Sequence, residues 1–318
     1  MTIQKVVVTD FSFSDLDLER EAALECGAEF LEFQCRSATE VANAVAGAKV
    51  AVVQFAAFDA SAAKEMAPNA TVLRYGVGYD NIDTEAAASN NIAVGYVPDY
   101  CVSEVAEHAA AASLSLLRKL PSLDSSVRRG EWKSTSAGKG IKPFSECVFG
   151  FLGFGNIGRA VHSRLQGFGF KFLIVDPIIA KTGAEQGVEI ASLDRLFREC
   201  DAISVHAPLN SETAGVVCAE TLSKMKPNAV VVNASRGGIV VEADLAEALR
   251  AGTIGGAALD VFSEEPLPAS SPLRDAPNLI LSPHAAYYSD SAIGRLQKSV
   301  AEDIRRALSG QPPRCRIV

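Results

Sequence analysis

The sequence has little of what would tie it to a membrane, to nucleic acid or to the secretory route. Its 318 residues include no uninterrupted apolar run of about 18 residues, which a membrane-spanning helix requires. The formal net charge is −8, which disfavours non-specific binding to nucleic acid or to an anionic membrane. The opening residues, MTIQKVVVTD, do not have the layout of a signal peptide. We therefore expect a cytoplasmic protein that has neither a membrane nor a nucleic acid as a partner.

Metal-binding residues are also scarce and scattered. The chain has four histidines and seven cysteines, with no C-x-x-C pair. Structural zinc sites take their ligands from such closely spaced pairs. Several cysteines lie in apolar runs, where a reduced thiol behaves as a small core side chain. We predict no metal site and reduced cysteines.

Apolar runs alternate with helical patterns along the chain. In the first hundred residues the expected strands are 5–10, 29–34, 49–55, 71–76 and 92–97, with helices at 16–27 and 37–47. Ser37 and Glu40 form a capping-box pattern at the start of the second helix. Farther on, the expected strands are 147–153, 171–176, 201–207, 228–234, 255–261 and 278–283, with helices at 192–200 and 241–252. This alternation predicts an α/β protein with two doubly wound parallel-sheet units of unequal size.

Two longer helices and one polar segment complete the pattern. An Ala/Leu-rich stretch predicts a helix over 103–120, with Ser103 as its N-cap and Pro121 as its stop. The polar segment 128–146 has no clear period, and we expect a loop there. An amphipathic helix is predicted over 291–310.

A glycine fingerprint stands near the middle of the chain, between a strand and a helix. Gly153, Gly155 and Gly158 form G-x-G-x-x-G in GFGNIGR, and the helix begins near Asn156 and Ile157. The first glycine permits a tight turn, the second lets the backbone approach a pyrophosphate, and the third allows close helix–strand packing. The N-terminus of the helix then binds the pyrophosphate. This βαβ context predicts a dinucleotide site.

An acidic residue, Asp176, ends the next apolar run. A carboxylate there can bind the hydroxyl groups of the adenosine ribose and would repel a 2′-phosphate. Pro177, Ile178 and Ile179 follow, so this stretch offers no arginine to a phosphate. The predicted cofactor is NAD(H), although a solvated strand end is the alternative reading of Asp176.

Three polar residues follow predicted strands of the second half: Arg236, Glu265 and His284. The carboxyl ends of strands in a doubly wound sheet converge on a ligand crevice, so the three could meet. An arginine can bind a carboxylate and polarise a carbonyl, and a histidine can protonate the developing alkoxide. A carboxylate beside the imidazole would orient it and favour its charged form. Each residue alone could be structural, but together they predict hydride transfer to a 2-oxo acid.

The motifs RYGVGYDNID, GFGNIGR, NASRGGIV, ALDVFSEEP and SPHAAYYS give the chain a specific resemblance. It resembles the D-isomer-specific 2-hydroxyacid dehydrogenase family over essentially its whole length. Within that family it looks closest to the branch of the C-terminal-binding proteins, which are NAD(H)-binding transcriptional corepressors. The resemblance implies a Rossmann cofactor domain, residues 103–287, inserted into a smaller flavodoxin-like substrate domain, residues 1–102 and 288–318.

The resemblance also implies roles for matched residues. Arg236, Glu265 and His284 match the catalytic set, and Asp260 matches an acid near the nicotinamide. The loop 207–213, with Ala207, Pro208 and Thr213, would line the adenosine half of the cofactor. Ala234 and Ser235, in the turn after the 228–234 strand, would flank its nicotinamide side. The N–H groups of Val77 and Gly78 would receive the substrate carboxylate. Arg74 could be a structural or a substrate-side cation.

The helix at 103–120 matches the part of the family that forms a dimer interface, so a homodimer is expected. Glu107 and His108 on this helix match a recurrent pair, which we interpret as structural.

The substrate side departs from the phosphoglycerate-specific relatives. Those enzymes carry a short cationic segment after the third strand, where this chain has Gln54, Phe55, Ala56 and Ala57. With Tyr287 as a second aromatic wall, we expect a small unphosphorylated 2-oxo acid as substrate. The alternative is an NAD(H)-sensing interaction protein like the corepressors, although no basic segment supports it.

Overall fold

A computed structural model describes residues 3–183 and 187–318 and separates them into two compact units. The first consists of Met1–Tyr100 and Ser289–Val318, and the second of Cys101–Tyr288. The sequence analysis placed these boundaries after residues 102 and 287. Over the described residues, helices that combine the length and apolarity needed to span a bilayer do not occur.

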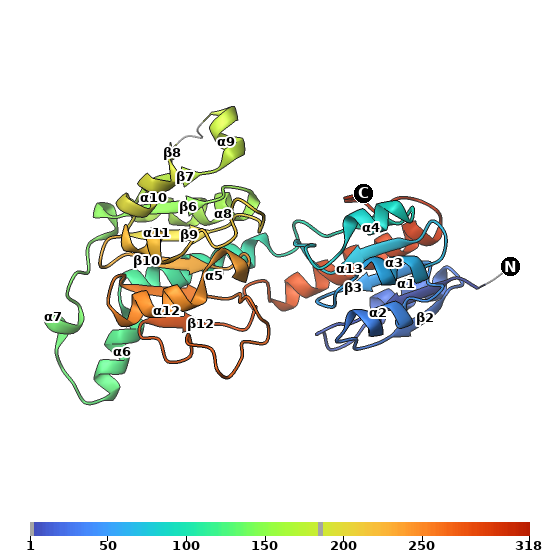
Figure 1. Ribbon diagram of the computed structural model, residues 1–318, viewed down its shortest axis with the longest axis horizontal. Coiled ribbons are helices and arrows are strands. Elements are labelled where there is room, and N and C mark those ends of the chain that lie inside the picture. The colour runs from blue at the N-terminus through green and yellow to red at the C-terminus, as the bar shows by residue number, and fades with distance from the viewer. Residues whose placement is uncertain (1–2, 184–186) are drawn as a thin grey trace. The chain divides into compact units, whose positions relative to one another are not determined.

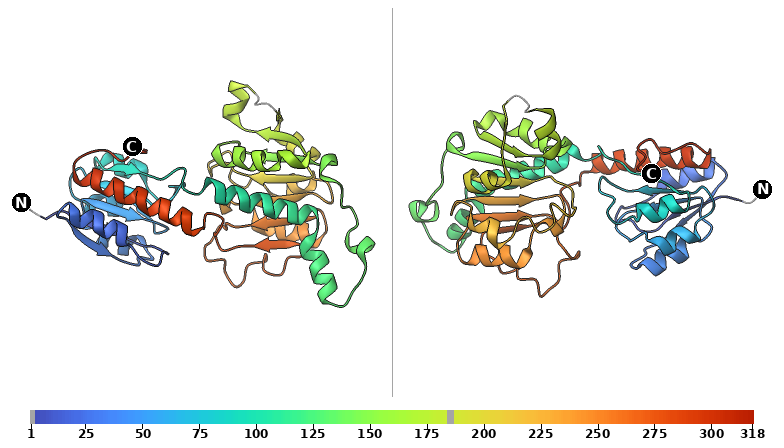
Figure 2. Two further views of the ribbon diagram at one scale, coloured as in Figure 1. Left: turned by 180° about the vertical axis from the view of Figure 1, so that it is seen from behind. Right: turned by 45° about the horizontal axis from the view of Figure 1, so that its top comes forward.

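The first unit contains a parallel sheet with helices on both faces. Its strand order is β2-β1-β3-β4-β5, formed by Lys5–Val8 (β1), Glu29–Glu32 (β2), Val50–Val53 (β3), Thr71–Arg74 (β4) and Ala93–Gly95 (β5). One face carries Ala38–Ala44 (α2), Ala60–Glu65 (α3) and Thr84–Ser89 (α4). The other carries Asp17–Glu25 (α1) and Asp290–Leu308 (α13), which lie side by side (Figure 2, left).

The second unit contains a larger parallel sheet of order β12-β11-β10-β9-β6-β7-β8. Its strands are Val148–Leu152 (β6), Lys171–Val175 (β7), Glu189–Ile190 (β8), Ala202–Val205 (β9), Val230–Asn233 (β10), Gly256–Leu259 (β11) and Leu279–Leu281 (β12). One face is covered by Val102–Leu117 (α5) and Asn156–Leu165 (α8), and the other by Leu193–Glu199 (α10), Ala219–Ser223 (α11) and Glu242–Arg250 (α12) (Figures 1 and 2).

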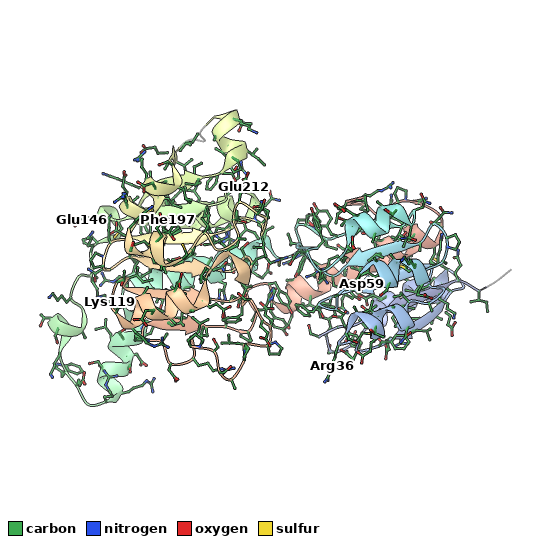
Figure 3. All side chains as sticks on the ribbon, in the orientation of Figure 1. Arg36, Asp59, Lys119, Glu146, Phe197 and Glu212 are labelled. Atoms are coloured by element: carbon green, nitrogen blue, oxygen red, sulfur yellow. The ribbon has the colours of Figure 1, made fainter. Side chains whose placement is uncertain are left out.

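Continuous apolar strands explain both sheets. The central strands, such as β3 and β9, are buried at every position, as expected when helices cover both faces of a parallel sheet. Phe197 of α10, labelled in Figure 3, is 1% exposed and belongs to the core on one face of the second sheet. The predicted fold class of two doubly wound α/β units is therefore confirmed.

Helix ends differ from the sequence prediction at two places. The Ser37 Oγ accepts the Glu40 N–H, but the Glu40 carboxylate accepts the N–H of Arg36 rather than that of Ser37, so the capping box is only half formed. The N-cap of α5 is Cys101, and the prediction of Ser103 was wrong because the chain already turns into the helix at Val102.

The segment after α5 has more helix than the sequence predicted. The helix α5 ends at Leu117, and Lys119 adopts a left-handed φ of 53° before Leu120–Arg128 (α6) begins. Pro121 thus lies in the first turn of the next helix, where its missing N–H is tolerated. Short helical turns, Ser134–Ala137 (α7) and Phe144–Glu146 (η1), interrupt the expected loop.

Candidate functional site

The glycine fingerprint lies where the strand order of the second sheet reverses, between β6 and β9. Gly153 has a φ of 88°, and a Cβ there would come within 2.6 Å of the backbone nitrogen of Ala207. A Cβ on Gly158 would meet the Gly153 carbonyl oxygen at 2.9 Å, whereas one on Gly155 would meet nothing within 4 Å. The two close approaches and the open position match what a dinucleotide-binding turn needs at a topological switch point.

Asp176 connects the end of β7 to this turn. Its carboxylate accepts the N–H groups of Phe154 at 2.8 Å, Ile178 at 2.8 Å and Ile179 at 3.0 Å. It therefore also caps the short helix Pro177–Thr182 (α9), which the sequence analysis did not predict.

Its environment keeps Asp176 charged. Partial burial alone would raise the pKa of Asp176, but the three N–H donors and the charge of Arg159 outweigh burial and lower it. The sequence analysis missed Arg159, which lies on α8 with its guanidinium over the Phe154 ring.

These residues fit a dinucleotide. The helix α8 begins at Asn156, so the first-turn N–H groups of Asn156, Ile157 and Gly158 have no acceptor within the helix and can receive a pyrophosphate. The open side of Gly155 leaves room for that approach, and Asp176 places one negative charge at the end of β7.

The expected cofactor loops lie close to the fingerprint. The Ser235 hydroxyl donates to the carbonyl of Ala207, which joins the ends of β9 and β10. In the 207–213 loop, the Thr213 hydroxyl donates to the Pro208 carbonyl at 2.6 Å and accepts the Asn210 N–H at 2.9 Å. Ala234 is half-buried on the same turn as Ser235.

Arg236 owes its position to the glycine that follows it. A Cβ on Gly237 would stand 1.9 Å from the carbonyl carbon of Phe262, so the two backbones pack directly against each other. The Phe262 N–H in turn donates to the Glu265 carboxylate at 2.9 Å. The loops that carry Arg236 and Glu265 are thus held together at the carboxyl ends of β10 and β11.

His284 and Glu265 form the central pair of the site. The Nδ1 of His284 lies 2.7 Å from the Glu265 Oε2. Partial burial would raise the pKa of Glu265, but the hydrogen bond and charge of His284, the Phe262 N–H and the charge of Arg236 lower it overall. Glu265 is therefore ionised at neutral pH and stabilises a positive charge on the imidazole. The ring of Tyr287 approaches that of His284 edge-on, with centroids 6.1 Å apart.

Asp260 holds the loop on which His284 lies. It is 2% exposed, and its carboxylate accepts the Ser282 hydroxyl at 2.6 Å and the N–H groups of Ala285 and Ala286 at 2.9 Å each. The Ser282 hydroxyl also lies 3.2 Å from the Nε2 of His108 on α5. The family resemblance associated Asp260 with the cofactor, whereas these three partners of its carboxylate, Ser282, Ala285 and Ala286, belong to the His284 loop.

The first unit carries the remaining candidates at the ends of β3 and β4. The N–H of Tyr75 donates to Val53, and the next N–H, that of Gly76, turns back to the carbonyl of Arg74 at 2.9 Å. Val77 and Gly78 follow in this turn and are half-buried. The Arg74 guanidinium is 9% exposed and donates to the Tyr75 carbonyl, which gives it a structural partner.

A buried carboxylate organises the turn that carries Phe55. Asp10 accepts three consecutive N–H groups, those of Gln54 at 3.1 Å, Phe55 at 2.5 Å and Ala56 at 3.0 Å. The Asn81 amide adds bonds to the carbonyls of Gln54 and Ala56. Phe55 itself is 47% exposed. Asp10 follows β1 and lies at the β1/β3 switch point of the first sheet, the one signal that could have identified it.

Comparisons with known proteins bear on the second unit. Residues 110–286 match the family model described as D-isomer specific 2-hydroxyacid dehydrogenase, NAD binding domain. The second unit is therefore an NAD-binding domain, and the predicted cofactor is confirmed. The NAD-dependent formate dehydrogenase of Staphylococcus aureus, solved in complex with NAD, has a TM-score of 0.87 and 28% identity, with 99% of each chain covered.

Two curated relatives differ in how much of their length is matched. D-3-phosphoglycerate dehydrogenase of Mycobacterium tuberculosis is 40% identical over 241 residues, which are 76% of this chain and 45% of that protein. Glyoxylate reductase of Korarchaeum cryptofilum is 37% identical over 254 residues, which are 78% of this chain and 76% of that protein. The chain thus spans about half the length of the phosphoglycerate dehydrogenases that it matches.

Proposed function

Since the chain belongs to the D-isomer-specific 2-hydroxyacid dehydrogenase family, we propose that it is an NAD-dependent reductase of a small unphosphorylated 2-oxo acid. The reverse reaction would oxidise the corresponding D-2-hydroxy acid. The observation that carries the proposal is the His284–Glu265 pair, 2.7 Å apart in the NAD-binding unit.

NAD(H), when bound, supplies or accepts the hydride, and this chain's residues handle the proton and the negative charges. His284 shares its Nδ1 proton with Glu265, which leaves the Nε2–H of the imidazolium to protonate the substrate oxygen. The ionised Glu265 favours that charged form. Arg236, whose charge already acts on Glu265, binds the carboxylate of the oxo acid and polarises its carbonyl.

The proposed substrate class rests on the first unit. Val77 and Gly78 offer backbone N–H groups to a carboxylate, in the turn after β4. The turn after β3 carries an exposed phenyl ring at Phe55 and no cation at 54–57. Its N–H groups at Gln54, Phe55 and Ala56 already bind Asp10, whose negative charge disfavours a phosphate there. This supports an uncharged side chain on the oxo acid, unlike the substrate named for the phosphoglycerate dehydrogenases.

The test is a panel of oxo acids assayed with NADH by loss of absorbance. We expect turnover with one or more of glyoxylate, hydroxypyruvate and pyruvate, and a much lower kcat/KM with 3-phosphohydroxypyruvate. A preference for the phosphorylated acid would contradict the proposed substrate class. Tight NADH binding without turnover of any acid would contradict the reductase and favour an NAD(H)-sensing interaction protein.

The role of His284 has a separate test. His284→Gln should reduce kcat for oxo-acid reduction by about 100-fold or more, because the proton donor is lost. NADH affinity, measured by fluorescence titration, should change little because the pyrophosphate contacts lie at the glycine turn. Lost NADH affinity would contradict this role.

We also propose a homodimer through α5 and the segment after it. The apolar side of α5 is buried within its own unit, but α6 and α7 leave the sheet (Figure 1). Val127 on α6 is 54% exposed, and Trp132, between α6 and α7, is 90% exposed. A second copy of the chain would cover such side chains. Light scattering should give twice the chain mass, and Trp132→Glu should shift the protein towards the monomer.

A further inference from the structure

Helix α1 carries an acidic residue, Glu19, on its buried face. Glu19 is 0% exposed and shares this face with Ala22 and Ala23. Among the described residues, neither carboxyl oxygen of Glu19 has a partner in hydrogen-bond geometry. An ionised carboxylate is costly in such a place, and burial raises the pKa of Glu19 to about 7.

The neighbour of this carboxyl is the hydroxyl of Tyr75. Tyr75 is 1% exposed, and its hydroxyl, like the Glu19 oxygens, has no partner in hydrogen-bond geometry among the described residues. The proximity of that hydroxyl partly offsets the effect of burial on the pKa of Glu19. The Tyr75 ring is fixed on its other side by Phe13, edge-on at 5.1 Å between centroids.

Helix α13 supplies the third member of the cluster, Gln297. Its side chain is 8% exposed and acts on the Glu19 carboxyl, while its Nε2 donates to the Asp15 carbonyl at 2.9 Å. Glu19, Tyr75 and Gln297 are therefore a buried polar cluster made from α1, the end of β4 and α13.

The charges around this cluster favour a protonated Glu19. Asp15 acts on Glu19 and Asp10 acts on Tyr75, and both raise the pKa of their neighbour. Several cations of the neighbouring elements have other partners: Arg20 pairs with Glu32, Arg305 with Glu25, and Arg314 with Asp303 and Glu302. The guanidinium groups of Arg74, Arg295 and Arg306 donate to the carbonyls of Tyr75, Tyr100 and Pro312, and Lys298 is exposed.

Tyr75 also connects the cluster to the proposed carboxylate-binding turn. Its N–H makes the last β3–β4 ladder bond, and the turn of Gly76, Val77 and Gly78 follows at once. The Gly76 carbonyl accepts the N–H of Val97 at 3.1 Å, so Tyr75 and Gly76, the two residues before Val77, are each held by a backbone hydrogen bond. The placement of Tyr75 therefore sets where the N–H groups of Val77 and Gly78 begin.

We propose that Glu19 is a positioning residue whose protonated, uncharged carboxyl, buried beside Tyr75 and Gln297, keeps the Val77–Gly78 turn in its carboxylate-binding shape. The inference rests on the proposed function, because it assigns that turn to the substrate carboxylate. Loss of the proton leaves a buried carboxylate beside Tyr75, and the turn then binds an oxo acid less well.

The test compares the wild type with Glu19→Gln, a neutral side chain of the same shape. The KM for the oxo acid is measured between about pH 6 and about pH 8.5. The two proteins differ only at position 19, so the ratio of the two KM values isolates the effect of Glu19. We expect the wild-type KM to rise about tenfold relative to that of the variant across this range. Glu21→Gln, on the exposed side of α1, is the matched control and should follow the wild type.

A second measurement detects the protonated carboxyl group of Glu19 directly and requires no enzymatic turnover. The infrared spectrum of the wild type at about pH 6 should contain a protonated-carboxyl band that Glu19→Gln lacks. Absence of that band, or a KM ratio that stays constant with pH, would overturn the inference. If the protonated-carboxyl band is present but the protein turns over no oxo acid, the result would instead contradict the proposed function. Should Glu19→Gln fail to fold, Tyr75→Phe should raise the KM, and an unchanged KM there would overturn the inference.

Discussion

Single residues decide the geometry of the proposed catalytic set, and Gly237 shows this most sharply. Its hydrogen atoms are all that separates the backbone after Arg236 from the Phe262 peptide. The motif NASRGGIV contributes to the family resemblance, but only the contact explains why glycine follows Arg236.

Gly237→Ala should therefore lower kcat by about 100-fold or more, because a Cβ would force apart the loops of Arg236 and Glu265. The measurement is steady-state reduction of the best oxo acid, together with the melting temperature. Gly167→Ala, at an exposed position with open space and no positive φ, is the control for the loss of a glycine. Equal kcat in Gly237→Ala and the wild type would contradict the contact.

Asp176 is a second single residue that shapes its surroundings, here on the cofactor side. Its three N–H partners tie the glycine turn to α9, and its charge faces the position expected for the adenosine ribose. Asp176→Ala should weaken NADH binding by about tenfold or more, because bonds to a charged acceptor contribute about 1.5–3 kcal/mol. The same change should narrow the preference for NADH over NADPH.

The two affinities are best compared by fluorescence titration. Asp194→Asn on the exposed side of α10 is a control that removes a carboxylate away from the glycine turn. An unchanged NADH to NADPH ratio in Asp176→Ala would show that Asp176 only caps α9.

At the scale of elements, the loop that carries His284 after β12 depends on one buried side chain, that of Asp260 at the end of β11. Asp260 binds Ser282, Ala285 and Ala286, and the His284 N–H donates to the Asp260 carbonyl at 2.8 Å. The φ of His284 is 51°, so the loop is held in a left-handed conformation that most side chains rarely adopt.

Asp260→Asn should reduce kcat by about tenfold to 100-fold with a smaller effect on NADH binding. An asparagine has one acceptor oxygen, so its NH₂ group would face a backbone N–H and loosen the loop. The readouts are kcat and the NADH dissociation constant measured on the same preparation. A large loss of NADH affinity with normal kcat would instead favour a direct cofactor role for Asp260.

At the scale of the whole molecule, the buried Glu19 links stability to pH. The raised pKa of Glu19 means that the folded state prefers the protonated form more than the unfolded chain does. The contribution of Glu19 to the stability of the folded state is thus fully present below about pH 4.5 and is lost as the pH rises through about 7. The loss is up to about 3 kcal/mol, since one pKa unit corresponds to about 1.4 kcal/mol.

Glu19→Gln should therefore melt at a higher temperature than the wild type at about pH 8, and the difference should shrink towards about pH 5. Differential scanning calorimetry can follow the transition of the first unit. A variant that is less stable than the wild type at both pH values would contradict a protonated Glu19.

Local patterns in the sequence predicted most strands and the longer helices, but not α6 or α9, and they marked candidate residues for the chemistry. Strand runs such as 228–234 and the G-x-G-x-x-G of GFGNIGR predict structure from neighbouring residues alone, because period and turn chemistry act over a few positions. Arg236, Glu265 and His284 were recognisable because each follows a strand, and parallel strands bring their carboxyl ends to one edge.

The tertiary structure decided which side chains hold those residues in place. Asp10 reaches the 54–56 turn across more than 40 positions of sequence, and Glu19 meets Tyr75 and Gln297 from distant elements. No local pattern marks such residues, because a buried carboxylate looks like any surface acid until the partners that surround it are known. The sequence by itself determined the family, the fold class and NAD as cofactor, since these depend on short motifs. The side chains that hold the site residues in place were found only in the tertiary structure, because they belong to elements far apart in the chain.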